Sequence, residues 1–382
     1  MIQKNREGIS LYIHIPFCRR KCHYCDFVSF IADRAELKRY ISYLKKETEI
    51  FFSRFSVGEI PVKTLYIGGG TPSLMESEDL GDLLDFLSKS FNLFPLYEFT
   101  IEANPETLDL LKFEEFKAIG VNRVSMGAQS FNDRTLNILG RIHNAHRIYE
   151  GFEVLRRAGF DNINIDLMFN LPEERVEDTL SSLRKAIELS PEHISYYSLT
   201  IEEGTFFYDI KDSLYLPAEA EEVREYKQGI ALLKKSGYHQ YEISNFASEG
   251  KRCLHNIAYW ESLPYLGLGV SAGSFIGGER TRNVSNLSLY YDKLCHHEMP
   301  YELREKLTGV KLKGEYIMMS LRLLEGVNNL SYYNKFGVFP EEDFADEIAY
   351  LKEYKFLSVD KYGFRFTKRG ILLANEVMTF FI

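Results

Sequence analysis

The sequence predicts an α/β protein built on a parallel sheet. Short runs rich in β-branched and aromatic residues alternate with longer segments in which apolar residues recur every three or four positions. Strands that alternate with helices are joined by right-handed crossovers, so we expect a parallel sheet, either open or curved into part of a barrel. The chain of 382 residues exceeds the roughly 250 to 300 residues of a single large core. We therefore also expect a second, smaller domain.

The predicted strands are short and rich in β-forming residues, and they cover residues 10–15, 62–69, 98–104, 123–129, 162–169 and 193–200. Helical periodicity is clearest in residues 35–54, 77–90, 146–158 and 176–189. Parallel strands end at a common rim, and proteins with such folds have their active or binding sites at this rim. Polar residues at or just after these strands are therefore candidates for one site.

The pattern changes after residue 205. Residues 1–205 are expected to form the α/β core, and the aromatic and glycine-rich segment 206–304 is expected to extend it with strands and loops. Residues 305–382 look like helices with a short hairpin, which predicts a small winged-helix-like α+β domain. This last segment lacks the dense basic helix of a DNA reader, so we predict a structural cap and no nucleic-acid partner.

Composition narrows the class of protein. The chain has 46 basic and 55 acidic residues, and the resulting net charge of −9 suits a soluble protein. No apolar run approaches the roughly 18 to 20 residues that span a bilayer, and the first ten residues lack the apolar core of a signal peptide. Three of the five cysteines crowd into one short segment, which favours metal or redox chemistry over a secreted disulfide framework. We expect a cytoplasmic protein.

The crowded thiols are Cys18, Cys22 and Cys25, in the spacing C-x3-C-x2-C directly after the first strand. A zinc site would need a fourth ligand, which His14, His23 or Asp26 would have to supply. A lone reactive thiol would not need two further cysteines. A [4Fe–4S] cluster held by three thiolates leaves one iron open for a substrate or cofactor, so it explains why no fourth cysteine is present. The spacing favours the cluster.

Further motifs follow the cysteines in a characteristic order, namely "GGGTPS", "IEANPE", "SMGAQSF", "GRIH" and "NIDLMFNLP". The cysteine spacing resembles the signature of the radical S-adenosylmethionine (SAM) superfamily. With these motifs and "YIHIPFC", the whole chain resembles the oxygen-independent coproporphyrinogen III oxidase-like family. The resemblance implies a partial (β/α)6 barrel of radical-SAM type. It also implies that a flavodoxin or ferredoxin reduces the cluster. The reduced cluster would then transfer an electron to SAM, which releases methionine and a 5′-deoxyadenosyl radical.

Glycines lie at the end of the second predicted strand and directly after it. Gly69 and Gly70, with Thr71, stand where the absence of side chains allows a ligand to approach the backbone closely. A glycine-rich turn is the alternative explanation. The resemblance implies that these residues contact the amino-acid end of SAM.

Polar residues at the ends of the next strands are further candidates, with Gln129 and Asp166 expected to close the fourth and fifth strands. Their alternative role is in structural salt bridges, but their shared rim favours a ligand site. Arg141 could pair with the methionine carboxylate of SAM. The resemblance implies cofactor contacts for a larger set, namely Tyr12, Tyr24, Glu102, Gln129, Asp166 and Thr200.

Two features indicate a branch of this family. The porphyrinogen-oxidising branch has a further cysteine at the position of Phe27 and a long segment before the cluster, whereas 17 residues precede Cys18 here. The heme-chaperone branch carries C-D-F after the second gap and H-N-x-x-Y-W, as this chain does at residues 25–27 and 255–260. The resemblance therefore favours the heme chaperone.

The H-N-x-x-Y-W motif places His255 beside Tyr259 and Trp260, an imidazole next to aromatic rings that would suit heme. Spacing alone favours a buried histidine in an aromatic core, and the resemblance reverses that preference. Cys253 is a second candidate heme ligand, although we expect both Cys253 and Cys295 to be unpaired buried thiols.

These observations predict a heme chaperone that binds a [4Fe–4S] cluster, SAM and heme, and delivers heme to an acceptor protein, for which a respiratory, membrane-associated protein is the candidate. The alternatives are an oxygen-independent coproporphyrinogen III oxidase or other radical SAM oxidoreductase, and a binding protein in which SAM is structural. No catalytic residue beyond the cofactor ligands is predicted.

Overall fold

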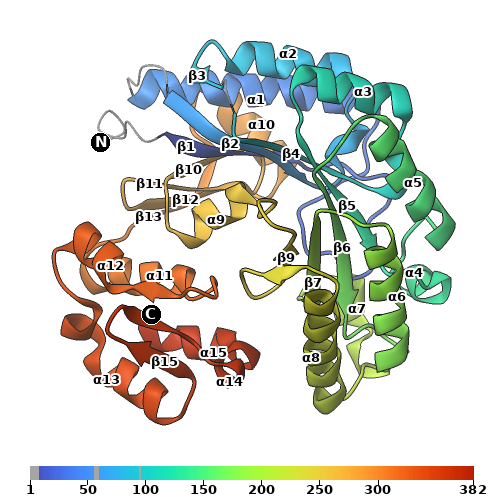
Figure 1. Ribbon diagram of the computed structural model, residues 1–382. Helices are drawn as coiled ribbons and strands as arrows, with labels where there is room; N and C mark the ends of the chain where they lie inside the picture. Colours follow the sequence, from blue (N-terminus) through green and yellow to red (C-terminus); the bar gives the residue numbers. More distant parts are fainter. Residues whose placement is uncertain (1–7, 56–59, 94–95) are drawn as a thin grey trace.

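A long curved sheet forms the centre of the protein in the computed structural model, which describes residues 8–55, 60–93 and 96–382 (Figure 1). Its middle consists of six adjacent parallel strands, β1 (Ile9–Ile15), β2 (Ile60–Gly69), β4 (Glu98–Ala103), β5 (Arg123–Gln129), β6 (Ile163–Phe169) and β7 (His193–Ser198). All six predicted strands are confirmed to within two residues at each end. The partial (β/α)6 barrel is confirmed with them.

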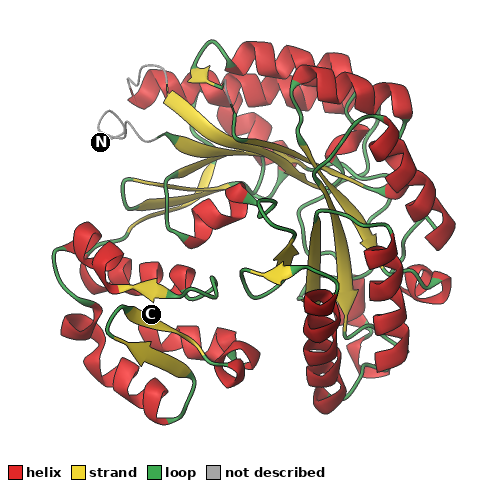
Figure 2. Ribbon diagram, viewed as in Figure 1, coloured by secondary structure: helices red, strands yellow, loops and turns green. Residues whose placement is uncertain are grey.

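Helices cover the convex side of this arc (Figure 2). The main ones are α1 (Arg34–Phe55), α2 (Ser77–Leu87), α3 (Leu110–Ile119), α4 (Asp133–Ile138), α5 (Ala145–Arg157) and α6 (Val176–Glu188). Three of these helices have an N-cap residue with a short polar side chain. Asp109, Asn132 and Asn144 each accept a hydrogen bond from a backbone N–H in the first turn. Two 3-10 turns, Pro72–Leu74 and Pro105–Thr107, follow β2 and β4.

The strands alternate between the two faces of the sheet. In β5, Val124 and Met126 are completely buried beneath the helices, whereas Arg123, Ser125 and Gln129 line a cavity on the concave side. This period of two makes the helix-facing side of the barrel wall apolar and the inner side polar. The inner side of the barrel therefore carries the polar side chains that can bind a ligand.

The segment after residue 205 extends the sheet at both edges. One edge gains β10 (Tyr265–Leu268), parallel to β1 with Ser10 opposite Tyr265, and then the antiparallel β11 (Gly273–Ile276), β12 (Glu279–Asn283) and β13 (Tyr301–Lys306). The other gains the antiparallel β9 (Asn245–Ala247) and β8 (His239–Gln240). The two-residue β3 (Phe91–Asn92) pairs with the start of β2.

The expected β-and-loop character of 206–304 is incomplete, because this segment also contains helices, namely α7 (Phe206–Asp209), α8 (Glu219–Lys235), α9 (Leu254–Trp260) and α10 (Leu287–Cys295). A further 3-10 turn covers Lys211–Ser213. The buried carboxylate of Glu47 on α1 fixes the extension, since it accepts hydrogen bonds from Gly269 N, Asn283 Nδ2 and Tyr290 Oη.

The C-terminal unit has a hydrophobic core of its own around Ile317, Tyr332 and Leu351. It contains a three-stranded sheet of β14 (Val327–Asn328), β16 (Gly363–Phe366) and β15 (Leu357–Asp360). Its helices are α11 (Gly309–Ser320), α12 (Asn329–Phe336), α13 (Pro340–Glu353), α14 (Lys368–Leu372) and α15 (Ala374–Met378), followed by a 3-10 turn at Thr379–Phe381. The winged-helix-like α+β prediction is confirmed. Among the described residues, no helix combines the length and the apolar character needed to cross a membrane.

Candidate functional site

A cavity of about 360 Å³ lies on the concave side of the barrel, below the loop that follows β1. Ten of the predicted site residues line it, namely Cys18, Cys22, Tyr24, Cys25, Gly69, Gly70, Glu102, Gln129, Arg141 and Asp166. They come from segments that are far apart in the sequence, and the parallel arrangement of the strands brings them together.

The three thiols of the C-x3-C-x2-C segment are free and half-buried, and all face this cavity. Thr71 Oγ1 donates a hydrogen bond to Cys18 Sγ at 3.5 Å, and Arg141 Nη1 donates one to Cys22 Sγ at 3.4 Å. Burial raises the pKa of the Cys18 thiol and raises that of Cys25 to about 11. Donors aimed at two sulfurs suit thiolates that bind a cationic group, so the donor set fits an iron–sulfur cluster.

The described residues contain no assembled group of three or more His, Cys, Asp or Glu side chains, the three cysteines included. A zinc site would also need a fourth ligand, and the two candidate histidines have other partners. His14 is occupied at both ring nitrogens, by the Tyr12 hydroxyl at 3.0 Å and by Val28 O at 2.9 Å. His23 Nδ1 lies 2.8 Å from Ile138 O. Both imidazoles therefore fix the cysteine loop to the barrel.

The glycine loop after β2 packs against the cysteine loop. Gly69 has φ +116, and a Cβ there would lie 2.7 Å from the His14 ring. A Cβ on Gly70 would lie 2.6 Å from Phe17 O. The glycines are required because two backbone segments meet here, which is a structural reason in addition to the predicted approach of a ligand.

Two carboxylates face the cavity from inside the barrel. Glu102 accepts hydrogen bonds from the Tyr66 hydroxyl at 2.8 Å and from Gly69 N at 3.0 Å, and burial raises its pKa to about 7. Asp166 accepts hydrogen bonds from Ser125 Oγ and Asn164 Nδ2, and burial raises its pKa. Asp166 lies in the middle of β6 and not at its end, so the expectation that it closes this strand is wrong.

Gln129 does close β5, in a left-handed conformation with φ +68, where the pairing with β6 contains a bulge. Its Oε1 accepts a hydrogen bond from the Tyr197 hydroxyl at 2.8 Å. Strained backbone of this kind is concentrated at functional sites, because the surrounding structure must hold it in place.

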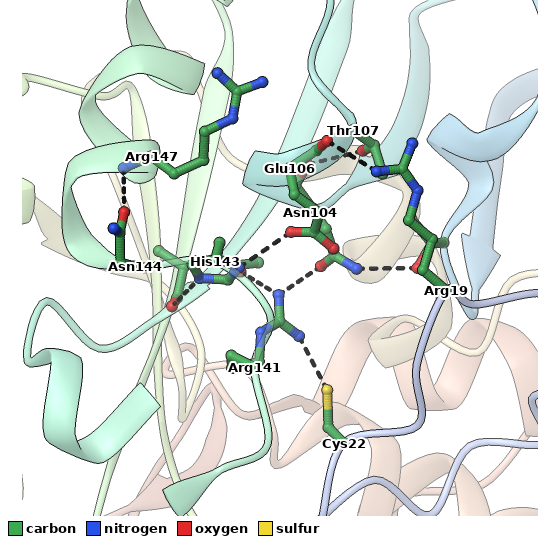
Figure 3. A network of polar contacts seen from close by, with 12 residues as sticks. Arg19, Cys22, Asn104, Glu106, Thr107, Arg141, His143, Asn144 and Arg147 are labelled. Atoms are coloured by element: carbon green, nitrogen blue, oxygen red, sulfur yellow. Dashed lines mark hydrogen bonds and ion pairs between the residues drawn. The ribbon is translucent and has the colours of Figure 1, made fainter. Parts of the chain in front are cut away.

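Arg141 is the centre of a polar network (Figure 3). Its Nη2 donates to Asn104 Oδ1 at 2.6 Å and to Gly127 O at 2.7 Å, while Nη1 reaches Cys22. Asn104 Nδ2 in turn donates to Thr71 Oγ1 at 2.9 Å. The sequence pattern did not single out Asn104, although it belongs to the quoted "IEANPE" motif. This asparagine joins the two residues that donate hydrogen bonds to the cysteine sulfurs.

Four predicted site residues do not line the cavity. Thr71 contacts Cys18 from the side, and Tyr12 hydrogen-bonds to His14. Thr200 is exposed beyond β7. Their predicted cofactor contacts stay predictions, as does that of the fourth residue, His255.

His255 is 1% exposed. Its Nδ1 lies 2.9 Å from Thr64 Oγ1, whose hydroxyl donates to Ser10 Oγ, so Nδ1 is assigned as the donor and Nε2 accepts from the Tyr259 hydroxyl at 2.8 Å. Burial lowers the pKa of His255 to about 3, so the ring is neutral. Direct binding of heme iron would require the bond to Tyr259 to break. The next residue, Asn256, lines the cavity instead.

The two remaining cysteines differ. Cys253 is completely buried, as expected, and its thiol lies 3.4 Å from Glu98 Oε1. Cys295 is exposed and lies 3.0 Å from the Tyr43 hydroxyl, so the expectation of a buried thiol is wrong there. It is on the last turn of α10, where the final residue of the helix turns towards solvent.

The cavity also contains polar residues that were not predicted, namely Arg123, Ser125, Asn164, Ser195, Ser244, Asn245 and Asn256. In β5 a signal was present, because "RVSMGAQ" alternates between inward and outward positions. Ser244 directly precedes β9, Asn245 is in β9 and Asn256 is in α9. The positions of these two elements depend on long-range contacts.

The cysteine-lined cavity inside a partial (β/α)6 barrel defines a protein of radical SAM type. The model of the radical SAM superfamily matches residues 12–184, and the model of the HemN C-terminal domain matches residues 314–373. Heme chaperone HemW of Bacillus subtilis (strain 168) is 36% identical over 98% of this chain and 99% of that protein. The corresponding protein of Escherichia coli (strain K12) is 33% identical over 98% of each chain.

A solved structure, coproporphyrinogen III oxidase (HemN) from Escherichia coli, described as a radical SAM enzyme, matches with a TM-score of 0.85 at 25% identity, over 98% of this chain and 90% of that one. With full-length relatives above 30% identity, the chain belongs to the HemW family of radical SAM proteins. Membership of this superfamily implies a [4Fe–4S] cluster and SAM.

Proposed function

We propose that this protein is a heme chaperone that carries a [4Fe–4S] cluster and SAM, binds heme and transfers it to an acceptor protein. The observation that carries the proposal is the similarity to proteins named heme chaperone HemW over 98% of the chain. A respiratory, membrane-associated protein is the proposed acceptor, and a flavodoxin or ferredoxin the proposed electron donor.

Cys18, Cys22 and Cys25 would hold the cluster. When reduced, the cluster supplies the electron for reductive cleavage of SAM. The hydrogen bonds from Thr71 and Arg141 to two of the sulfurs would stabilise the thiolate form and raise the reduction potential of the bound group, because they offset negative charge on sulfur.

SAM would occupy the cavity next to the cysteines. Glu102 has a pKa of about 7, and a nearby cation, such as the ammonium or sulfonium of SAM, would stabilise its charged form. The remaining ligands proposed for SAM are Tyr12, Tyr24, Gly69, Gly70, Thr71, Gln129, Arg141, Asp166 and Thr200. The lining is mostly polar, but it includes the aromatic rings of Phe27, Tyr66 and Tyr197, which would limit the access of water to the cofactor.

Heme would bind at α9, where His255 would supply an imidazole nitrogen to the iron in place of its hydrogen bond to Tyr259. We also propose the division into a core of residues 1–205, an extension of 206–304 and a C-terminal unit of 305–382. The separate hydrophobic core around Ile317 supports the last boundary.

Oxidation of coproporphyrinogen III is the second candidate, and the TM-score of 0.85 to the HemN structure favours it. Phe27 counts against it. This side chain is 57% exposed and lines the cavity at the position where the oxidising branch is expected to have a cysteine.

The test is anaerobic reconstitution of iron and sulfide, followed by heme titration and a coproporphyrinogen turnover assay on the same sample. We expect a heme complex and no decarboxylated product. Turnover of the porphyrinogen without heme binding would refute the chaperone function. Formation of 5′-deoxyadenosine after reduction would separate a SAM-cleaving protein from one in which SAM is structural.

A further inference from the structure

Arg123 is a buried cation at the floor of the cavity. It is the first residue of β5, its side chain is 2% exposed, and it lines the cavity. Its Nε has no hydrogen-bond partner, and within the described residues the guanidinium forms no ion pair. A buried unpaired charge is costly, so a protein normally supplies it with a partner. Among the residues that the structure describes, no acidic side chain forms an ion pair with Arg123.

The charged groups around Arg123 are already engaged. Glu98 attracts the guanidinium electrostatically, but its carboxylate accepts hydrogen bonds from the backbone N–H of Leu254 and His255 at the start of α9. The two carboxylates of the cavity, Glu102 and Asp166, are likewise hydrogen-bonded to other groups. The donors of Arg123 are left for a molecule that enters the cavity.

Arg123 differs in this respect from Arg141, the other buried arginine of the cavity. Arg141 uses its guanidinium on Asn104, the carbonyl of Gly127 and Cys22. Arg123 lies six positions before Gln129, which closes β5 at the rim. Six positions along a strand correspond to about 20 Å. Arg123 therefore lies towards the opposite end of the barrel from the end of β5.

Two neutral amides share the cavity with Arg123. Asn245 and Asn256 face the same cavity from β9 and α9, and Asn245 Oδ1 has no partner within the described part of the chain. A guanidinium with free donors among neutral amides matches a planar anion, because a carboxylate can accept two parallel N–H bonds from one arginine.

We propose that Arg123 forms a carboxylate-binding subsite at the floor of the barrel cavity. This subsite rests on the proposed function, which supplies two carboxylate-bearing ligands. One source is a propionate arm of heme, which would reach Arg123 at the end of the barrel away from the cysteine loop. The other is the methionine carboxylate of SAM, for which Arg141 is the competing partner. In either case the ligand carboxylate replaces the missing counter-ion of Arg123, and Asn256 places the H-N-x-x-Y-W motif of α9 at the same ligand.

The test compares each ligand with a form that lacks the carboxylate. Dissociation constants are measured anaerobically on the cluster-loaded full chain for hemin and hemin dimethyl ester, and for SAM and decarboxylated SAM. The variants are Arg123→Gln, which removes the charge, and Arg123→Lys, which keeps it. Arg157→Gln is the control for loss of a positive charge, because this arginine is exposed at the end of α5 and does not line the cavity. Iron content and melting temperature check that each variant is folded and loaded.

We expect the wild type to bind one of the two acids about 10- to 100-fold more tightly than its neutral form, and Arg123→Gln to abolish that preference. Arg123→Lys should keep part of it, and Arg157→Gln should leave it unchanged. The affected pair identifies the source of the carboxylate.

A wild type that does not distinguish either acid from its neutral form overturns the subsite, and this comparison needs no variant to fold. A preference that survives in Arg123→Gln also overturns it. Both outcomes leave the chaperone function standing, whereas a wild type that binds none of the four compounds refutes the proposed function and the subsite together.

Discussion

Replacement of Gly70 by alanine is expected to separate the glycine loop from the cysteine loop. The new Cβ would lie 2.6 Å from Phe17 O and 2.8 Å from Phe17 N, and neither backbone atom can move without shifting the neighbouring Cys18. The contact also strains the hydrogen bond from Thr71 N to Phe17 O, which is 2.8 Å long. Overpacking costs about 1 to 3 kcal/mol and a weakened backbone hydrogen bond about 1 kcal/mol more.

The free energy of unfolding should therefore fall by about 2 to 4 kcal/mol. An unfolding entropy of about 2.1 cal/mol/K per residue gives roughly 0.8 kcal/mol/K for a chain of this length, so the melting temperature should fall by about 3 to 5 °C. Thermal unfolding followed by circular dichroism measures the shift. Iron analysis after reconstitution should show reduced cluster loading, because Cys18 is displaced.

Gly81 provides the matched control. It lies inside α2, and a Cβ there would have nothing within 4 Å, so Gly81→Ala should be neutral or should stabilise the helix by up to about 1 kcal/mol. Wild-type melting temperature and wild-type iron content in Gly70→Ala would refute the claim that the two loops touch at this residue.

Four other predictions concern the cofactors. Cys22→Ser should abolish the broad visible absorption of the reconstituted protein and its iron content of about four per chain; stoichiometric zinc in the wild type would contradict this. Arg141→Ala should weaken SAM binding by about 1.5 to 3 kcal/mol with iron retained, measured by equilibrium dialysis, and unaltered affinity would make Arg141 a purely structural partner of Asn104. His255→Ala should shift the heme absorption bands and leave the cluster spectrum intact, and identical heme spectra would exclude it as a ligand. Since Glu102 has a raised pKa of about 7, it is neutral below and charged above that pH, so SAM affinity should rise with pH through 7 and Glu102→Gln should remove this dependence.

The sequence predicts the barrel well because its six central strands are locally encoded. Each combines β-forming residues with a strong alternation, and helices with clear periodicity separate them. The added strand β10 could not be predicted in the same way. It has four residues, and its place beside β1 depends on pairing with residues some 255 positions earlier, such as Ser10 opposite Tyr265.

The candidate site shows the same limit. Most residues of the motifs at or after strands gather at one cavity, because parallel strands end together, but Thr200 does not reach it. The orientation of α9 was not predictable, since it depends on the Glu98 carboxylate, which binds the N–H groups of Leu254 and His255. That contact turns His255 into the core and Asn256 towards the cavity, so the motif was recognised but its inward-facing residue was not.

Glu98 and Glu102 stand four positions apart on β4 and both point into the barrel. Glu98 anchors α9, whose residues lie more than 150 positions further along the chain, and Glu102 contacts the glycine loop. Because alternate residues of a strand face opposite sides, a single inserted or deleted residue between them would turn one of the two carboxylates into the helix layer. We therefore expect β4 to tolerate substitutions at its outward-facing positions but no change in length, whereas the connections on the outside of the barrel can lengthen freely.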